Sequence, residues 1–152
     1  MKLNLNLFGK KHSCVGKSYP IERIDTCFGH TRFIIKLYSG KRIVKLIIDS
    51  GAQQGLLLEN KIHNCDYEEL GTTDSMFGVS GEIPVRKIRM RFSFNKENAK
   101  RKPKYELIFN VTSDNGTILS IGCESHVAGL LGADFLSKCS VDFVNLRLTI
   151  LQ

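Results

Sequence analysis

Apolar and polar residues alternate along much of the chain, a pattern typical of β-strands. Phe33, Ile35 and Leu37 fall on one face of a first strand. A turn at Ser39-Gly40 then leads into an apolar strand over residues 43–48. Side chains two residues apart share a face of a strand, so the alternation predicts strands with one face in a core.

A β-hairpin is predicted over residues 71–94. Ile88, Met90 and Phe92 alternate with polar residues on its second strand, and Gly78 and Gly81 stand near its tip. Because glycine accepts backbone conformations that other residues avoid, a tip of this kind can move.

The carboxyl-terminal part continues the β pattern around one short helix. Residues 105–111 alternate, and Asp114-Asn115-Gly116 predicts a hairpin turn into residues 117–121. We expect a helical segment from Ala133 to about Lys138, followed by residues 141–143, a turn near Asn145 and a last strand over residues 146–151. The predicted class is therefore mostly β.

Two regions are expected from the distribution of these patterns. Residues 1–28 lack sustained periodicity, and we interpret them as a basic arm of unknown role. Residues 29–152 are expected to fold as one domain, because a chain of 152 residues with 42% hydrophobic residues suits a single core.

Composition indicates in which cellular compartment the protein is expected. Five cysteines form an odd set without paired spacing, which favours a reducing compartment over a disulfide framework. The first residues alternate leucine with asparagine and do not form the apolar run of a secretory signal, so we expect a cytoplasmic protein with no membrane partner. The net charge of +7 alone does not identify a specific nucleic-acid partner.

The strongest chemical signal is the tetrapeptide Asp49-Ser50-Gly51-Ala52, into which the apolar strand over residues 43–48 runs directly. Such a strand end places a carboxylate at a sharp turn, where glycine permits close approach of backbone and substrate. An isolated Asp-Ser-Gly is usually only a turn. A second segment therefore has to support any catalytic interpretation.

That second segment is Gly129-Leu130-Leu131-Gly132 followed by the predicted helix. Together the two segments resemble the retropepsins, the single-lobed retroviral-type aspartic peptidases. The resemblance runs from about Thr31 to the end of the chain and includes the terminal hairpin. It implies a small closed β-barrel with one short carboxyl-terminal helix and a β-hairpin flap.

The resemblance also assigns roles to individual residues. It implies that Asp49 is the catalytic aspartate and that the remaining matched positions bind substrate: Ser50, Gly51, Ala52 and Gln53 in the turn, and Met76, Phe77, Gly78 and Val79 in the flap. Many viral members carry acidic residues after the alanine and an arginine after the glycine of the second motif, whereas this chain has Gln53, Gln54 and Ala133 there. The Asp-Ser-Gly-Ala-Gln motif is more similar to the ubiquitin-shuttle branch, which also shares the Leu-Leu-Gly-x-Asp pattern ending at Asp134.

The reaction itself sets the stoichiometry. An aspartic peptidase needs one ionised and one protonated carboxylate in a shared site, yet the chain contains a single Asp-Ser/Thr-Gly. We therefore predict a homodimer that hydrolyses peptide bonds in peptides or proteins without metal or cofactor. The alternative is a catalytically silent dimer of the same fold that binds peptides or acts as a scaffold.

Other chemistries have weaker support. His63-x-Cys65 and Cys123-x-x-His126 offer four zinc ligands, but neither spacing is a standard pair. No Gly-x-Ser-x-Gly elbow or phosphate-binding loop is present. The basic loop over residues 95–104 lacks interleaved aromatic residues, which leaves nucleic-acid binding resting on charge alone.

Overall fold

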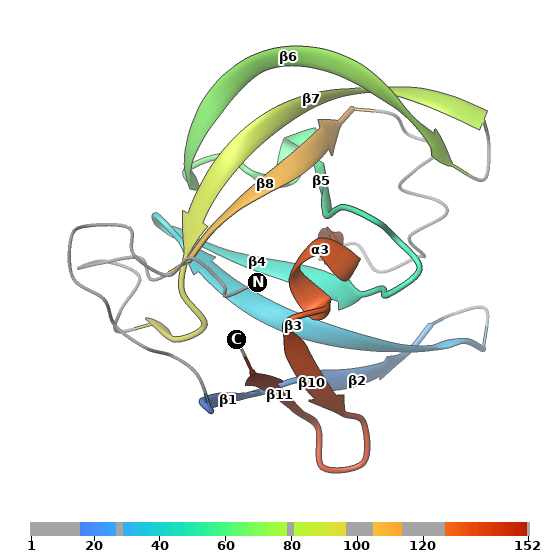
Figure 1. Ribbon diagram of the computed structural model, residues 1–152, viewed down its shortest axis with the longest axis vertical. Coiled ribbons are helices and arrows are strands. Elements are labelled where there is room, and N and C mark those ends of the chain that lie inside the picture. Colours follow the sequence, from blue (N-terminus) through green and yellow to red (C-terminus); the bar gives the residue numbers. More distant parts are fainter. Residues whose placement is uncertain (1–15, 27–28, 79–80, 97–104, 114–126, 152) are drawn as a thin grey trace.

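The described residues of the protein form two β-sheets and one short α-helix (Figure 1). This computed structural model describes residues 16–26, 29–78, 81–96, 105–113 and 127–151, apart from the side chains at 72, 73 and 76–78. The strands are β1 (Ser18–Pro20), β2 (Glu22–Asp25), β3 (Thr31–Ser39), β4 (Arg42–Ile48), β5 (Leu56–Leu58), β6 (Asp66–Gly78), β7 (Gly81–Phe92), β8 (Tyr105–Thr112), β9 (Val127–Leu131), β10 (Cys139–Asp142) and β11 (Arg147–Ile150). The helices are the 3-10 turn η1 (Glu59–Lys61) and α3 (Ala133–Leu136).

The mostly β class with one short helix is confirmed, and so are the main hairpins. β3 and β4 pair antiparallel, and the predicted hairpin over residues 71–94 is present as β6 and β7, with Gly78 opposite Gly81. The hairpin begins earlier than expected, at Asp66, and α3 ends earlier, at Leu136. The predicted turn at residues 114–116 and the strand at 117–121 lie outside the described residues.

Neither sheet closes on itself among the described strands, so the expected closed barrel is not confirmed. The larger sheet has eight strands in the order β2-β3-β4-β9-β5-β8-β7-β6, and the smaller sheet has the order β1-β11-β10. The two open sheets instead pack around a common core, to which β3, β7, β10 and β11 all contribute.

Part of the expected amino-terminal arm belongs to these sheets. Residues 18–20 form β1, which pairs with β11, and residues 22–25 form β2, which pairs with β3. Between the two strands, Ile21 is only 4% exposed and lies in the main core cluster. Residues 16–26 therefore pack with the body of the domain.

The centre of the large sheet has an unusual crossing. β9 pairs parallel with β4 and antiparallel with β5, while β5 pairs parallel with β8. Since β9 stands between β4 and β5, the loop over residues 49–55 that joins those two strands must pass across the end of β9. This topology brings two segments about eighty residues apart into contact.

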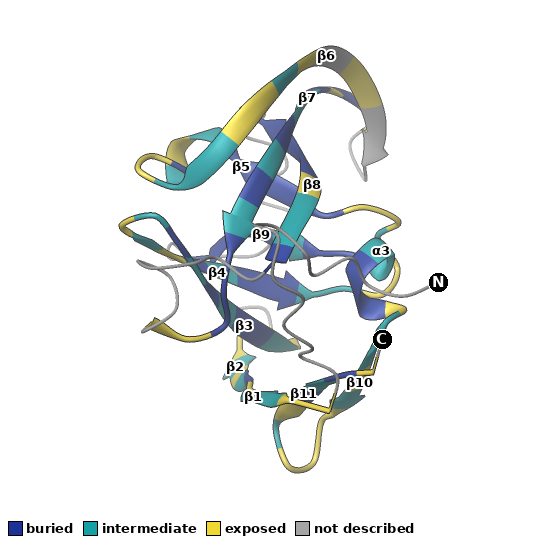
Figure 2. Ribbon diagram, turned by 60° about the vertical axis from the view of Figure 1, so that its left-hand side comes forward, coloured by how far each residue is buried: buried dark blue, intermediate teal, exposed yellow. Residues whose placement is uncertain are grey.

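Aromatic residues fill the space between the sheets and the helix. Phe92 stacks on Tyr105 with ring centroids 5.6 Å apart, and Phe135 of α3 lies 6.3 Å from Phe92. Figure 2 shows the buried residues concentrated on β4, β5, β9 and α3, whereas the turn between β10 and β11 is exposed. Phe135 and Leu136, which form the second half of α3, are buried and attach the helix to the core.

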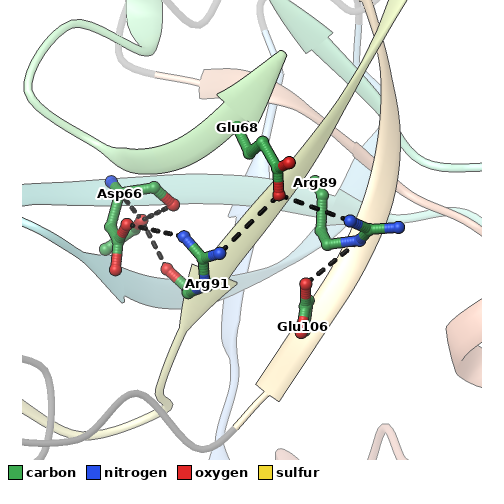
Figure 3. Close-up of polar contacts among 6 residues, drawn as sticks. Asp66, Glu68, Arg89, Arg91 and Glu106 are labelled. Carbon is green, nitrogen blue, oxygen red and sulfur yellow. Dashed lines mark hydrogen bonds and ion pairs between the residues drawn. The ribbon is translucent and has the colours of Figure 1, made fainter. Parts of the chain in front are cut away.

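Charged residues on β6, β7 and β8 form a continuous ladder on the partly exposed face of the sheet (Figure 3). Arg91 Nη1 lies 3.3 Å from Asp66 Oδ1, and Arg91 Nη2 lies 3.7 Å from Glu68 Oε2. Arg89 Nη1 lies 3.3 Å from the same oxygen of Glu68, and Arg89 Nε lies 3.0 Å from Glu106 Oε1. Exposed ion pairs of this kind add little stability. Their alternation across neighbouring strands nevertheless favours this register over one shifted by a residue.

The described residues contain no helix long and apolar enough to cross a membrane.

Ile21 provides a test of whether the amino-terminal residues contribute to folding. Because its side chain is 4% exposed, we expect Ile21→Ala to lower the free energy of unfolding by about 2–4 kcal/mol, through lost burial and the cavity left behind. The matched control is Ile43→Ala, whose side chain is 53% exposed and whose effect should stay within about 0.5 kcal/mol. Urea unfolding of both variants measures the difference, and equal small effects would contradict a structural role for this segment.

Candidate active site

Asp49 follows β4 directly, and its backbone and carboxylate are both held by local hydrogen bonds. Its N–H donates to the Leu131 carbonyl at 3.0 Å, which continues the β4–β9 ladder by one residue. The Gly51 N–H donates to Asp49 Oδ1 at 3.0 Å, and the Ala52 N–H donates to the Asp49 carbonyl at 3.2 Å. A Cβ at residue 51 would lie 3.2 Å from Asp49 Oδ1, so glycine leaves room around the carboxylate. The turn thus fixes the half-buried Asp49 at a defined position.

The first residues of α3 form hydrogen bonds to the loop over residues 49–55. The N–H of Ala133 donates to the Ala52 carbonyl at 2.7 Å, and the N–H of Asp134 donates to the Gln53 carbonyl at 3.1 Å. The first N–H groups of a helix have no partner within the helix, and here the loop supplies acceptors for two of them. A Cβ at Gly132 would lie 2.9 Å from the Ala52 carbonyl oxygen, so this close approach requires glycine.

Asp134 adds a side-chain link to this contact. Its carboxylate accepts hydrogen bonds from the N–H of Phe135, at 3.0 Å, and from the backbone of Gly55 at the far end of the loop. Burial nevertheless raises the pKa of Asp134, because loss of water penalises the charged form more than these hydrogen bonds compensate. Asp134 therefore holds the loop in place at an electrostatic cost.

On its other side the loop borders a cavity beneath the β6–β7 hairpin, which arches over the body in Figure 1. The cavity has a volume of about 580 Å³, within the range of ligand-binding clefts. It is lined by Gly51, Ala52, Gln53 and Gln54 from the loop, Asp74 and Ser75 from β6, Val85 and Lys87 from β7, and Asn110 from β8. The carboxylate of Asp49 adjoins this wall through its hydrogen bond to Gly51.

The structure brings only some of the predicted site residues together. Gly51, Ala52 and Gln53 line the cavity, and Ser50 is exposed beside Asp49. The backbone of Met76, Phe77 and Gly78 forms the outer end of β6, paired with residues 81–83 of β7. Val79 lies outside the described residues. The structure thus groups the turn residues, and it describes the hairpin tip only along its backbone.

Several residues that line the cavity were not predicted from the sequence as site residues. Gln54, Asp74, Ser75, Val85, Lys87 and Asn110 all line the cavity. Val85 and Lys87 alternate with Arg86, so strand periodicity puts both on one face, but it does not show that the face covers a cleft. Asn110 alternates with Phe109 and Val111 and so reads as an outward polar position. The sequence carries no local signal for its burial.

The described cysteines are free and are poor candidates for nucleophiles. Burial raises the pKa of Cys65 to about 11 and that of Cys139 to about 12, so both thiols remain protonated near neutral pH. Of the four suggested zinc ligands, Cys123 and His126 lie outside the described residues. The described part of the chain contains no cluster of three or more metal-ligating side chains.

Comparison with known proteins identifies the fold. The crystal structure of a retropepsin-like aspartic protease from Rickettsia conorii is similar to this chain, with a TM-score of 0.53 and 17% sequence identity, and the match covers 88% of this chain and 98% of that one. No protein-family model and no curated protein matches the sequence. At this level of identity the similarity shows a retropepsin-like fold.

The shifted pKa of Asp134 leads to a pH-dependent prediction. Between the ordinary aspartate pKa, about 3.9, and its raised value, the folded state binds more protons than the unfolded state. The stability contribution of this group therefore falls as pH rises through that interval. We expect Asp134→Asn to melt at a higher temperature than wild type near pH 7.5, with the gain shrinking near pH 3 in calorimetric melts.

Asp142 is a matched control with the opposite shift. Hydrogen bonds from the backbone and side chain of Asn145 lower the pKa of Asp142, so this group stabilises the fold above the ordinary aspartate pKa and loses that effect in acid. Asp142→Asn should therefore melt lower than wild type near pH 7.5 and converge with it in acid. The same pH trend for both variants would contradict the proposed origin of the Asp134 shift.

Proposed function

We propose that the protein is an aspartic endopeptidase that acts as a homodimer, with Asp49 as its catalytic residue. The observation that carries this proposal is the carboxylate of Asp49 on a glycine-bearing turn, held by Leu131 and supported by Ala133 within a retropepsin-like fold. A plain turn needs no such support. The adjoining cavity offers space for substrate side chains.

The proposed reaction uses the Asp49 carboxylates of two chains. Two carboxylates in contact cannot both ionise easily, so the pair holds one proton over an acidic to near-neutral range. The ionised member removes a proton from a water molecule, which attacks the scissile carbonyl, while the protonated member donates to the carbonyl oxygen. The tetrahedral intermediate then collapses as the amide nitrogen is protonated and the peptide bond breaks. No metal takes part in these steps.

The remaining parts of the fold have proposed roles around this pair. The β6–β7 hairpin acts as a flap that closes over the peptide and excludes water, with Met76 to Val79 near its tip. Among retropepsin-like proteins, the motif from Asp49 to Gln53 favours a relationship with the ubiquitin-shuttle branch over the viral enzymes. The substrate is a peptide or an extended protein segment.

Dimer formation is the first test, because one Asp-Ser-Gly per chain leaves half of the catalytic pair. Sedimentation velocity at assay concentrations should show a dimer, and the specific activity should fall on dilution as the dimer dissociates. A monomer with undiminished specific activity would rule out a pair made from two chains.

Asp49→Asn tests the chemistry at the same site. Asparagine keeps the shape of the side chain but removes the ionisable group from both halves of the pair, so cleavage of a peptide library should be lost. The variant should still dimerise and melt no lower than wild type, because repulsion between two carboxylates is relieved. The assay contains a metal chelator, which should leave the wild-type rate unchanged.

The outcomes of this test separate the candidate functions. Undiminished cleavage by a folded Asp49→Asn protein would overturn the peptidase proposal. A wild-type protein that binds peptides as a dimer, yet cleaves none, would instead be the catalytically silent binding module.

A further inference from the structure

Asn110 is a buried polar residue whose hydrogen bonds are incomplete. Its side chain is 6% exposed, and its Nδ2 donates to Gln54 Oε1 at 3.0 Å. Among the described residues, none donates a hydrogen bond to its Oδ1, which is itself shielded from solvent. A buried acceptor without a partner is costly, and in native proteins such a group usually has a specific reason. Asn110 is one of the residues that line the adjoining cavity.

The neighbours of Asn110 define the chemistry of that wall. Lys87 stands directly opposite Asn110 across the β7–β8 pair, and both residues line the cavity. Lys87 forms no ion pair within the described part of the chain, so its ammonium group is available as a donor. Gln54, which is exposed, covers Asn110 with a flexible side chain that an incoming group can displace.

We infer that this cavity selects a carboxamide side chain, glutamine or asparagine, of the bound peptide; the inference rests on the proposed function. A carboxamide donates an N–H to Asn110 Oδ1 and accepts from the Lys87 ammonium through its own oxygen. Gln54 already shows that Asn110 pairs with such a group. The formal charges of Asp74 and Lys87 cancel, which favours a neutral side chain over a carboxylate or an ammonium group. Val85 and Ala52 provide apolar contact for its methylene groups.

The twofold symmetry of the proposed dimer adds a positional consequence. Each chain contributes one copy of the cavity, so the two copies lie on opposite sides of the catalytic pair. The preference for a carboxamide is therefore expected at one position before the scissile bond and at one position after it.

The test measures binding separately from cleavage. A positional-scanning peptide array is probed with the Asp49→Asn protein, and each position carries glutamine, asparagine, glutamate or the similarly sized methionine. We expect glutamine or asparagine peptides to bind about tenfold more tightly than their methionine counterparts, the effect expected of one to two net hydrogen bonds. In the Asp49→Asn background, Asn110→Leu should reduce this ratio to about twofold or less. Asn60→Leu, at an exposed asparagine of η1 outside the cavity, should retain it.

A second variant covers the case in which Asn110→Leu fails to fold. Lys87→Met keeps a long side chain at a half-buried strand position but removes the donor for the carboxamide oxygen, so it should weaken the preference by about fivefold. This inference would be overturned if the protein showed no preference for carboxamide side chains, or if both cavity variants kept that preference. Either result would count against it even if wild type cleaves peptides. If the protein cleaves no peptide but shows a carboxamide preference that both variants weaken, the inference about the cavity would stand. Only the proposed peptidase activity would then be overturned.

Discussion

The close approach of β9 to the loop between β4 and β5 is the contact on which the rest of the structure depends. A Cβ at Gly129 would overlap the Leu56 carbonyl oxygen, and one at Gly132 would press on the backbone of Ala52 and Gln54. These two glycines let β9 insert between β4 and β5. The insertion aligns Leu131 with the Asp49 N–H and Ala133 with the Ala52 carbonyl, so the same contact that closes the core also fixes the candidate catalytic turn.

Both candidate functional elements are maintained at some cost to stability. Asp134 is half-buried, and the resulting desolvation raises its pKa, yet its carboxylate connects the helix to the far end of the loop. Asn110 is buried with an acceptor that lacks a partner among the described residues. Neither arrangement is the most stable choice for a core. Asn110 lines the cavity where substrate is proposed to bind, and Asp134 holds the loop that forms one wall of that cavity. Departures from optimal packing are expected at such places.

Much of the fold was predictable because its signals are local. The alternation over residues 31–48, the glycine-bearing tip of the β6–β7 hairpin and the terminal hairpin all depend on residues close together in the sequence. β1 and β2, with three and four residues, are too short to show periodicity, and their partners β11 and β3 decide whether they form. Closure of the sheet depends on pairing between distant edges, and alternation carries no information about such pairing.

The sequence by itself determined the chemistry of the turn, since a strand that ends in Asp49-Ser50-Gly51 places a carboxylate beside a glycine whatever the surrounding fold. Its resemblance to the retropepsins also implied that the segment from Gly129 to Gly132 belongs with that turn. Only the tertiary structure decided what surrounds the turn. Alternation assigns Asn110 to the face opposite Phe109, which is normally solvated, but Asn110 is only 6% exposed, and its side chain donates a hydrogen bond to Gln54 from the loop between β4 and β5. Burial of a residue depends on which distant segments pack over it, and that is a property of the assembled sheet and not of neighbouring residues.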